Sequence, residues 1–319
     1  MKRHLLCLTV DTDPDGLSGR VTNRQTLRWE GLKNLRRLPE DLDGYAAQLG
    51  RLPITWFVRA DGQLESAFGS STYLLEAFQD FWTKVKGAGH EVAWHPHLYC
   101  QAKPNDTALL ISDPLKASDE LERLWSTLKP SFLSTTFRNG EGWHTPETYV
   151  TVERLGFRCD STAIPGRRGA LGHPMNWNGA PNQPYFPAVN DLCGSGPERS
   201  ILELPMNTWL LQAPHDDAPK LRYMNPAVHH HLFAKALENW QNACNLLPAD
   251  LCVWVMIFHP DEVLAKQDAD ALYSHSMPEL CANLVSITNS LRQVGHDFQW
   301  VTLEDAAELW KEHWQRMIA

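Results

Sequence analysis

The stretch LLCLTVDTD (Leu5–Asp13) joins a short apolar run to two acidic residues. The run Leu5–Val10 has the length and the apolar and β-branched content of a buried strand. Similar runs recur along the chain, separated by longer segments with amphipathic character. The predicted strands are Leu5–Val10, Ile54–Val58, Glu91–Trp94, Ser134–Phe137, Phe157–Asp160, Ile201–Leu204, Val253–Phe258 and Phe298–Val301.

The segments between these runs predict helices. In one of them, Leu280, Leu284, Ile287 and Leu291 are spaced by three and four residues and form one apolar helix face. Alternating strands and helices favour an α/β fold, a distorted barrel of about seven or eight parallel strands with helices outside. No break in composition divides the chain, so we expect a single domain over residues 1–319. The predicted helices are Asp41–Leu49, Thr72–Lys86, Lys116–Leu128, Pro146–Leu155, Pro226–Leu247, Met277–Val294 and Leu303–Met317.

Composition excludes several classes of protein. Hydrophobic residues make up 43% of the 319 residues and charged residues 21%, which fits a folded chain with a large core. The net charge of -9 argues against a nucleic-acid partner, which requires a concentrated basic surface. The seven cysteines form no CxxC pair, which favours reduced thiols in a cytoplasmic protein. No run approaches the roughly 18 to 20 apolar residues of a membrane span, and the apolar start is too short for a signal peptide. The sequence is compatible with a monomer and with a homo-oligomer.

Polar residues cluster where the predicted strands end. In parallel β/α barrels this edge carries the active site, so the pattern predicts a catalytic rim. A long segment without strand or helix signals, Ile164–Pro197, contains Trp177, Tyr185 and Phe186, and these aromatic residues favour an ordered flap over a linker. The residues that follow or end predicted strands are Asp11, Asp13, Arg59, Asp61, His95, His97, Arg138, Asp160, Glu203 and His259.

The tripeptide His95-Pro96-His97 suits metal binding. A residue before proline favours an extended conformation, and alternate side chains of an extended segment point to the same side. Both imidazoles could therefore converge on one ion, with Asp13 completing a set of two histidines and one carboxylate. Two partly exposed loop histidines are about as compatible with this tripeptide taken alone. His259 follows a buried strand and reaches the same rim, whereas a satisfied core histidine is the less favoured interpretation.

The order of these motifs resembles the polysaccharide deacetylase family, also called the NodB-homology family or carbohydrate esterase family 4. In this form of the pattern the second motif is HxH, which would make His97 the second metal histidine. The resemblance covers about residues 5 to 310. Its motifs are LTVDTD (8–13), GHEVAWHPH (89–97), FRNGEGW (137–143) with LGFRCDST (155–162), MIFHP (256–260) and WVTLEDAAELW (300–310).

The resemblance implies a NodB-like barrel and a role for each motif residue. Asp13, His95 and His97 would bind a divalent metal, with Zn²⁺ favoured and Co²⁺, Ni²⁺ or Mn²⁺ as alternatives. Asp11 would be the general base, held in place by Arg138, and His259 the acid that protonates the leaving amine. Asp160 would orient His259 or an arginine, with a strand-end cap equally favoured. The predicted substrate-binding residues are Asp61, Trp94, Trp143, Asp160 and Tyr185.

The expected function is therefore removal of an N-acyl group, N-acetyl above all, from a sugar or sugar-derived metabolite. One alternative is a metal-dependent amidohydrolase that acts on a non-sugar amide, as a deformylase or an allantoinase does. The other is a non-catalytic carbohydrate-binding barrel. Retention of a candidate base, acid, arginine and three metal ligands counts against a decayed site.

Overall fold

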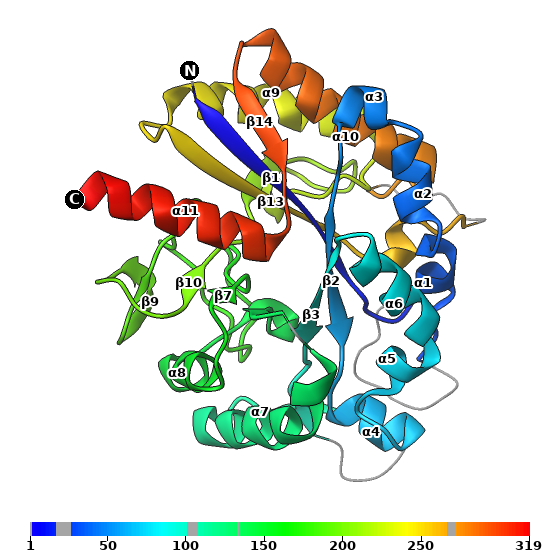
Figure 1. The fold of residues 1–319 in the computed structure, drawn as a ribbon, viewed down its shortest axis with the longest axis vertical. Coiled ribbons are helices and arrows are strands. Elements are labelled where there is room, and N and C mark those ends of the chain that lie inside the picture. The colour runs from blue at the N-terminus through cyan, green and yellow to red at the C-terminus, as the bar shows by residue number, and fades with distance from the viewer. Residues whose placement is uncertain (1, 17–26, 101–107, 133, 267–271) are drawn as a thin grey trace.

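The strands form one parallel sheet that curves into a distorted barrel (Figure 1). The computed structural model describes residues 2–16, 27–100, 108–132, 134–266 and 272–319. Within these residues the strand order is β10-β7-β6-β3-β2-β1-β13, and neighbouring strands are parallel throughout. This confirms the predicted fold class. The strands are β1 (Arg3–Asp11), β2 (Ile54–Arg59), β3 (Glu91–His95), β6 (Thr136–Phe137), β7 (Cys159–Asp160), β10 (Leu202–Glu203) and β13 (Leu251–Phe258).

The two ends of this strand path approach each other. Met206, just after β10, forms a parallel bridge with Val255 of β13. The backbone N–H of Asn207 donates to the carbonyl of Val255 at 3.3 Å. The path therefore closes through a single bridge and not through a full strand ladder.

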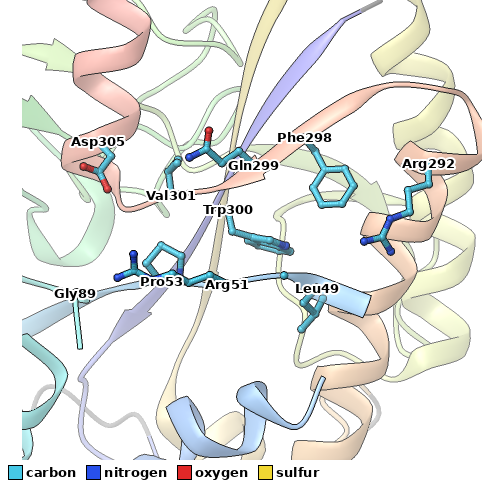
Figure 2. Close-up of a pocket in the computed structure, with 11 residues that line it drawn as sticks. Leu49, Arg51, Pro53, Gly89, Arg292, Phe298, Gln299, Trp300, Val301 and Asp305 are labelled. Carbon is cyan, nitrogen blue, oxygen red and sulfur yellow. The ribbon is translucent and has the colours of Figure 1, made fainter. Parts of the chain in front are cut away.

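An eighth strand, β14 (Asp297–Trp300), pairs with the same edge of β1 as β2 does. It pairs with residues 3–6 of β1, and β2 pairs with residues 8–11. A notch is left between the end of β14 and the start of β2, and it contains a cavity of about 420 Å³ lined by Pro53, Trp300 and Val301 (Figure 2). This cavity lies at the N-terminal end of β2, away from the strand ends that carry the candidate catalytic residues.

Helices surround the strands (Figure 1). The predicted helix Asp41–Leu49 is two short helices, α2 and α3, and Thr72–Lys86 is divided at Phe78 into α5 and α6. Neither α1 nor α4 was predicted from the sequence. The helices are α1 (Glu30–Leu35), α2 (Leu38–Asp43), α3 (Ala46–Leu49), α4 (Gly62–Phe68), α5 (Tyr73–Ala77), α6 (Gln79–Gly87), α7 (Pro114–Leu128), α8 (Pro146–Arg154), α9 (His230–Leu246), α10 (Met277–Gln293) and α11 (Leu303–Ile318).

The last helix, α11, covers the N-terminal end of the barrel and contacts β1, β7 and β13. Its first turn is fixed by Glu91 at the start of β3, whose carboxylate accepts hydrogen bonds from the backbone N–H groups of Leu303 and Glu304 at 3.0 and 3.2 Å. Helix α11 therefore covers the N-terminal ends of these strands, opposite the ends that carry Asp11 and His95.

Strand alternation divides the core into two layers. Leu6, Leu8 and Val10 belong to the large cluster that also includes the helix side chains, whereas Leu5 and Cys7 belong to a smaller cluster with Leu303 and Trp310 of α11. Successive side chains of a strand point to opposite faces, so odd-numbered residues of β1 face the barrel interior. Asp11 lies on that interior face.

The long segment Ile164–Pro197 is ordered, as expected from its aromatic content. Trp177, Tyr185 and Phe186 are buried, and the indole N–H of Trp177 donates to the carbonyl of Gly142 at 2.6 Å. The segment ends in the hairpin β8 (Pro187–Ala188) and β9 (Asp191–Ser195). Two further hairpins, β4 (Tyr99–Cys100) with β5 (Leu109–Leu110) and β11 (Thr208–Leu211) with β12 (Lys220–Tyr223), complete the described strands.

Two further features concern the cysteines and the hydropathy of the helices. All seven cysteines are unpaired thiols. Within the described ranges, the helices are too short or too polar to cross a bilayer.

Candidate functional site

Two aspartates at the end of β1 enter the barrel mouth from one side. Thr12 between them faces the other way, where its hydroxyl accepts a hydrogen bond from the backbone N–H of Arg59 at 2.9 Å. Its own N–H donates to the carbonyl of Phe57 at 3.0 Å. These two bonds fix the end of β1 against β2, so the DxD spacing presents Asp11 and Asp13 together. Both side chains are almost fully buried.

The two histidines of the HPH segment converge on Asp13. The Nε2 atoms of His95 and His97 lie 3.3 Å apart, and the two rings are perpendicular. The Nε2 atom of His97 lies 3.0 Å from Asp13 Oδ1, and that of His95 lies 3.9 Å from the same oxygen. The extended-segment argument therefore predicted this convergence.

The His95 ring is oriented as a metal ligand would be. The Nδ1 atom of His95 lies 2.9 Å from the carbonyl of Arg138, so this nitrogen is the N–H donor and Nε2 is the free acceptor. Burial lowers the pKa of His95 below its ordinary value, despite the charges of Asp11 and Asp13. His95 is therefore neutral at neutral pH and presents a lone pair to the centre of the cluster.

Gly140 leaves room for the His97 ring. A Cβ atom at this position would lie 2.2 Å from Cδ2 of the His97 ring, which is closer than any real contact. The backbone N–H of Gly140 also donates to the carbonyl of Pro96 at 2.8 Å. The loop after β6 is thus fixed directly against the HPH segment, and only glycine fits there.

The three donor atoms fit one divalent cation. Ligand atoms of Asp13, His95 and His97 lie within 4.8 Å of one another, and all three residues are buried. Asp13 Oδ1 is buried and accepts no hydrogen bond of acceptable geometry within the described residues, although His97 lies close to it. Burial alone would raise the pKa of Asp13, but His97, His95 and Arg59 hold it well below the usual range, so the carboxylate is ionised. Two imidazoles and one carboxylate form the donor set of an open catalytic site for Zn²⁺ or a similar cation.

Arg138 fixes the other aspartate. This fully buried guanidinium donates from Nη1 to Asp11 Oδ1 at 2.6 Å and to the Thr9 hydroxyl at 2.9 Å. Its Nε and Nη2 groups donate to the carbonyl and hydroxyl of Ser161 at 2.8 and 2.9 Å. The Cζ atom of Arg138 lies 4.0 Å from the centre of the Phe57 ring. Asp11 Oδ2 stays directed toward the cluster, 3.6 Å from His95 Nε2.

His259 lies beside Asp13, whereas Asp11 lies beside His95. Its Nε2 atom lies 3.7 Å from Asp13 Oδ2, and its Nδ1 atom lies 3.2 Å from Glu262 Oε1. Glu262 also accepts the backbone N–H of His259 at 2.8 Å and the amide of Asn225 at 2.7 Å. Burial alone would lower the pKa of His259, but Glu262, with Asp13 and Asp11, raises it to about 10. The imidazole is therefore protonated at neutral pH.

These side chains surround a cavity of about 160 Å³ at the C-terminal ends of the strands. All six residues predicted to bind metal or catalyse line it. The sequence interpretation missed other lining residues and the carboxylate behind His259. Glu262 had one signal, its position three residues after His259, where a short helical turn brings the side chain back. The missed lining residues are Asn139, Glu141, Gly142, Ile164, Met206, Tyr223 and Ile257.

The five residues predicted to contact substrate lie elsewhere. Asp61 is fully buried, forms an ion pair with Arg59 at 2.6 Å and caps α4. Trp94 and Trp143 are fully buried, and the indole N–H of Trp94 donates to the carbonyl of Ala60. Tyr185 donates to the carbonyl of Leu192 at 2.8 Å. None of these four side chains is among the residues that line the cavity at the strand ends.

Asp160 completes that set, and among the described residues no hydrogen bond or ion pair joins it to His259 or to an arginine, so the equally favoured strand-end cap is the interpretation that fits. Its carboxylate lies 3.1 Å from His144 Nε2 and accepts the backbone N–H of Thr162 at 2.8 Å. Glu262 takes the place beside His259 that Asp160 was expected to have.

Comparisons with known proteins show the fold. No family model and no curated protein matches the chain. A solved structure from Mycobacterium smegmatis, provisionally classed as a polysaccharide deacetylase, is 17% identical, with a TM-score of 0.52 over 98% of this chain and 91% of that chain. A family 4 carbohydrate esterase from Streptomyces lividans in complex with acetate is 11% identical, with a TM-score of 0.35 over 94% of this chain and 93% of that chain. The first likeness shows that the chain has the fold of a polysaccharide deacetylase.

Proposed function

We propose that this chain, which shares the deacetylase fold, is a metal-dependent hydrolase that removes an N-acyl group from a sugar or sugar-derived metabolite. One observation carries the proposal. The buried donors of Asp13, His95 and His97 converge on one point, with Asp11 beside one of these ligands and His259 beside another. Amide hydrolysis needs a base near the attacking water and an acid near the leaving nitrogen, and this arrangement offers both.

Asp13, His95 and His97 would hold the cation, with Zn²⁺ favoured and Co²⁺, Ni²⁺ or Mn²⁺ as alternatives. When bound, such an ion polarises the acyl carbonyl and acidifies water. Asp11 accepts the proton of the attacking water, and Arg138 keeps the carboxylate in place through the 2.6 Å contact. His259 then donates its proton to the leaving amine nitrogen. Glu262 keeps the His259 ring oriented and charged before that step.

The size of the cavity supports a short acyl group. Its volume of about 160 Å³ is well below the roughly 300 Å³ at which pockets for drug-sized ligands begin. An acetyl or formyl group therefore fits beside the cluster, while a long acyl chain would extend beyond this cavity.

The test is amine release from a panel of N-acetylated sugars by protein supplied with Zn²⁺. Asp11→Asn should retain the metal and lose at least about a hundredfold in kcat, the usual contribution of a general base. Asp119→Asn, on the exposed face of α7, is the matched control and should be fully active. Absence of amine release with every divalent cation and every amide in the panel would overturn the proposal.

A further inference from the structure

A second cavity adjoins the candidate active site. It has a volume of about 140 Å³, and its lining includes Arg167, Arg222, Tyr223, Asn225 and Tyr273. Tyr223 lines both this cavity and the one that contains the metal-type cluster. The two cavities therefore share one wall, and a substrate that passes the Tyr223 ring would occupy both.

This second cavity lies on the side of the proton donor. The centre of the Tyr223 ring is 6.2 Å from that of His259. Asn225 donates to Glu262 at 2.7 Å, and the Tyr273 hydroxyl is hydrogen-bonded with Tyr223 and Glu262. Since His259 would protonate the leaving amine, the substituent carried by that amine extends toward this cavity and the acyl group does not.

The lining is cationic. Within the described part of the chain, the guanidinium of Arg167 has no carboxylate and no hydrogen-bond partner, whereas Arg222 is paired with Asp216 at 2.6 Å. Among the residues that the structure describes, Arg167 therefore brings a positive charge without a carboxylate partner. Burial raises the pKa values of Tyr223 and Tyr273 far above the ordinary range, so both hydroxyls stay neutral.

The volume limits what can enter. At roughly 30 Å³ for each water molecule, the cavity holds only a few waters. It can take one small group of a substrate and not a whole sugar ring. A carboxylate or phosphate matches both the size and the guanidinium, which binds planar oxyanions through two parallel hydrogen bonds.

We propose that Arg167 and this cavity bind an oxyanion on the amine half of the substrate, so that the enzyme acts on N-acylated amines bearing a carboxylate or phosphate. This inference rests on the proposed hydrolase function, because that function assigns the amine half to the side of His259.

The first test compares neutral and anionic substrates. N-acetylglucosamine is the neutral probe, N-acetylglucosamine 6-phosphate supplies a phosphate, and N-acetylmuramic acid supplies a carboxylate. At least one anionic probe should have a KM about 10-fold to 100-fold below that of the neutral one, the ratio expected for a hydrogen bond to a charged group. Arg167→Gln should abolish this ratio. Arg168→Gln, the exposed neighbour, should retain it.

The second test measures binding without catalysis. Calorimetry with glucosamine, glucosamine 6-phosphate and inorganic phosphate uses the protein as purified. The proposal expects the phosphorylated amine to bind at least about tenfold more tightly than glucosamine, and Arg167→Gln to remove that difference. Equal binding of both amines, or a preference that survives Arg167→Gln, would overturn it. If the anion binds through Arg167 but nothing is hydrolysed, the anion site stands and the hydrolase function fails.

Discussion

Replacing Arg138 with methionine should destabilise the protein strongly, because the substitution leaves a buried carboxylate without its cation. The guanidinium is fully buried and contacts Asp11 at 2.6 Å. Breaking a buried pair by removing one partner costs about 3 to 5 kcal/mol. With about 2.1 cal/mol/K of unfolding entropy for each of the 319 residues, this cost lowers Tm by about 4 to 8 °C.

A double-mutant cycle isolates the contact itself. Asp11→Asn alone leaves Arg138 buried without its charged partner, and the double variant removes both charges. Thermal unfolding of the four proteins should give a coupling free energy of at least about 1.5 kcal/mol, within the usual range for buried networks. Arg138→Lys keeps the charge but loses the fork that reaches Ser161, so its stability should be intermediate. Additive effects within about 0.5 kcal/mol would refute the inferred clamp on Asp11.

Three further outcomes are expected. Glu262→Gln should lower kcat about tenfold or more with little change in KM, because Glu262 keeps the His259 ring oriented and charged; steady-state kinetics measure this. Burial and Asp160 raise the pKa of Glu203 well above its ordinary value. The contribution of protonated Glu203 to the free energy of unfolding is therefore complete below about pH 4.5 and falls as the pH rises toward the folded-state pKa. Glu203→Gln should therefore reduce the loss of Tm between about pH 5 and about pH 8, measured by thermal unfolding. Gly140→Ala should weaken metal affinity at least about tenfold in a competition titration, because the new methyl group displaces the His97 ring.

Each of these predictions can be contradicted by a stated result, and the Gly140 prediction also has a matched control. Gly87→Ala adds a methyl group where no atom lies within 4 Å, so it should leave metal affinity unchanged. Equal metal affinity in the Gly140 and Gly87 variants would contradict the packing argument. Parallel Tm curves for Glu203→Gln and the parent protein would show that Glu203 does not titrate abnormally. An unchanged kcat in Glu262→Gln would remove that residue from the mechanism.

The sequence predicted the barrel because several of its strands are continuous apolar runs. Runs such as Leu5–Val10 and Val253–Phe258 are apolar on both faces, as expected for buried parallel strands. The short helices were harder to predict. The carboxylate of Asp61 caps α4 by accepting hydrogen bonds from the N–H groups of Gln63 and Leu64, so it is already engaged within the protein.

The candidate cluster was predictable for the same reason, since its members follow strands that end at one rim. The other residues that line the two cavities were not predictable in this way. Strand alternation could have excluded Trp94, because it adjoins His95 and must face the opposite side of the sheet. Tyr223 and Arg167 could not have been found, because their positions depend on the hairpin β11–β12 and the ordered segment after Ile164, which have no periodic sequence signal.

Metal content tests the central claim most directly. Protein equilibrated with Zn²⁺ and then desalted should retain about one ion per chain by plasma mass spectrometry, since the described residues include one group of three candidate ligands. His95→Ala should retain none, and Asp11→Asn should retain the full amount because Asp11 is bound by Arg138 and is not one of the three ligands. A parent protein without metal, or a His95→Ala variant that binds it as well as the parent, would contradict the assignment of Asp13, His95 and His97 as the metal site.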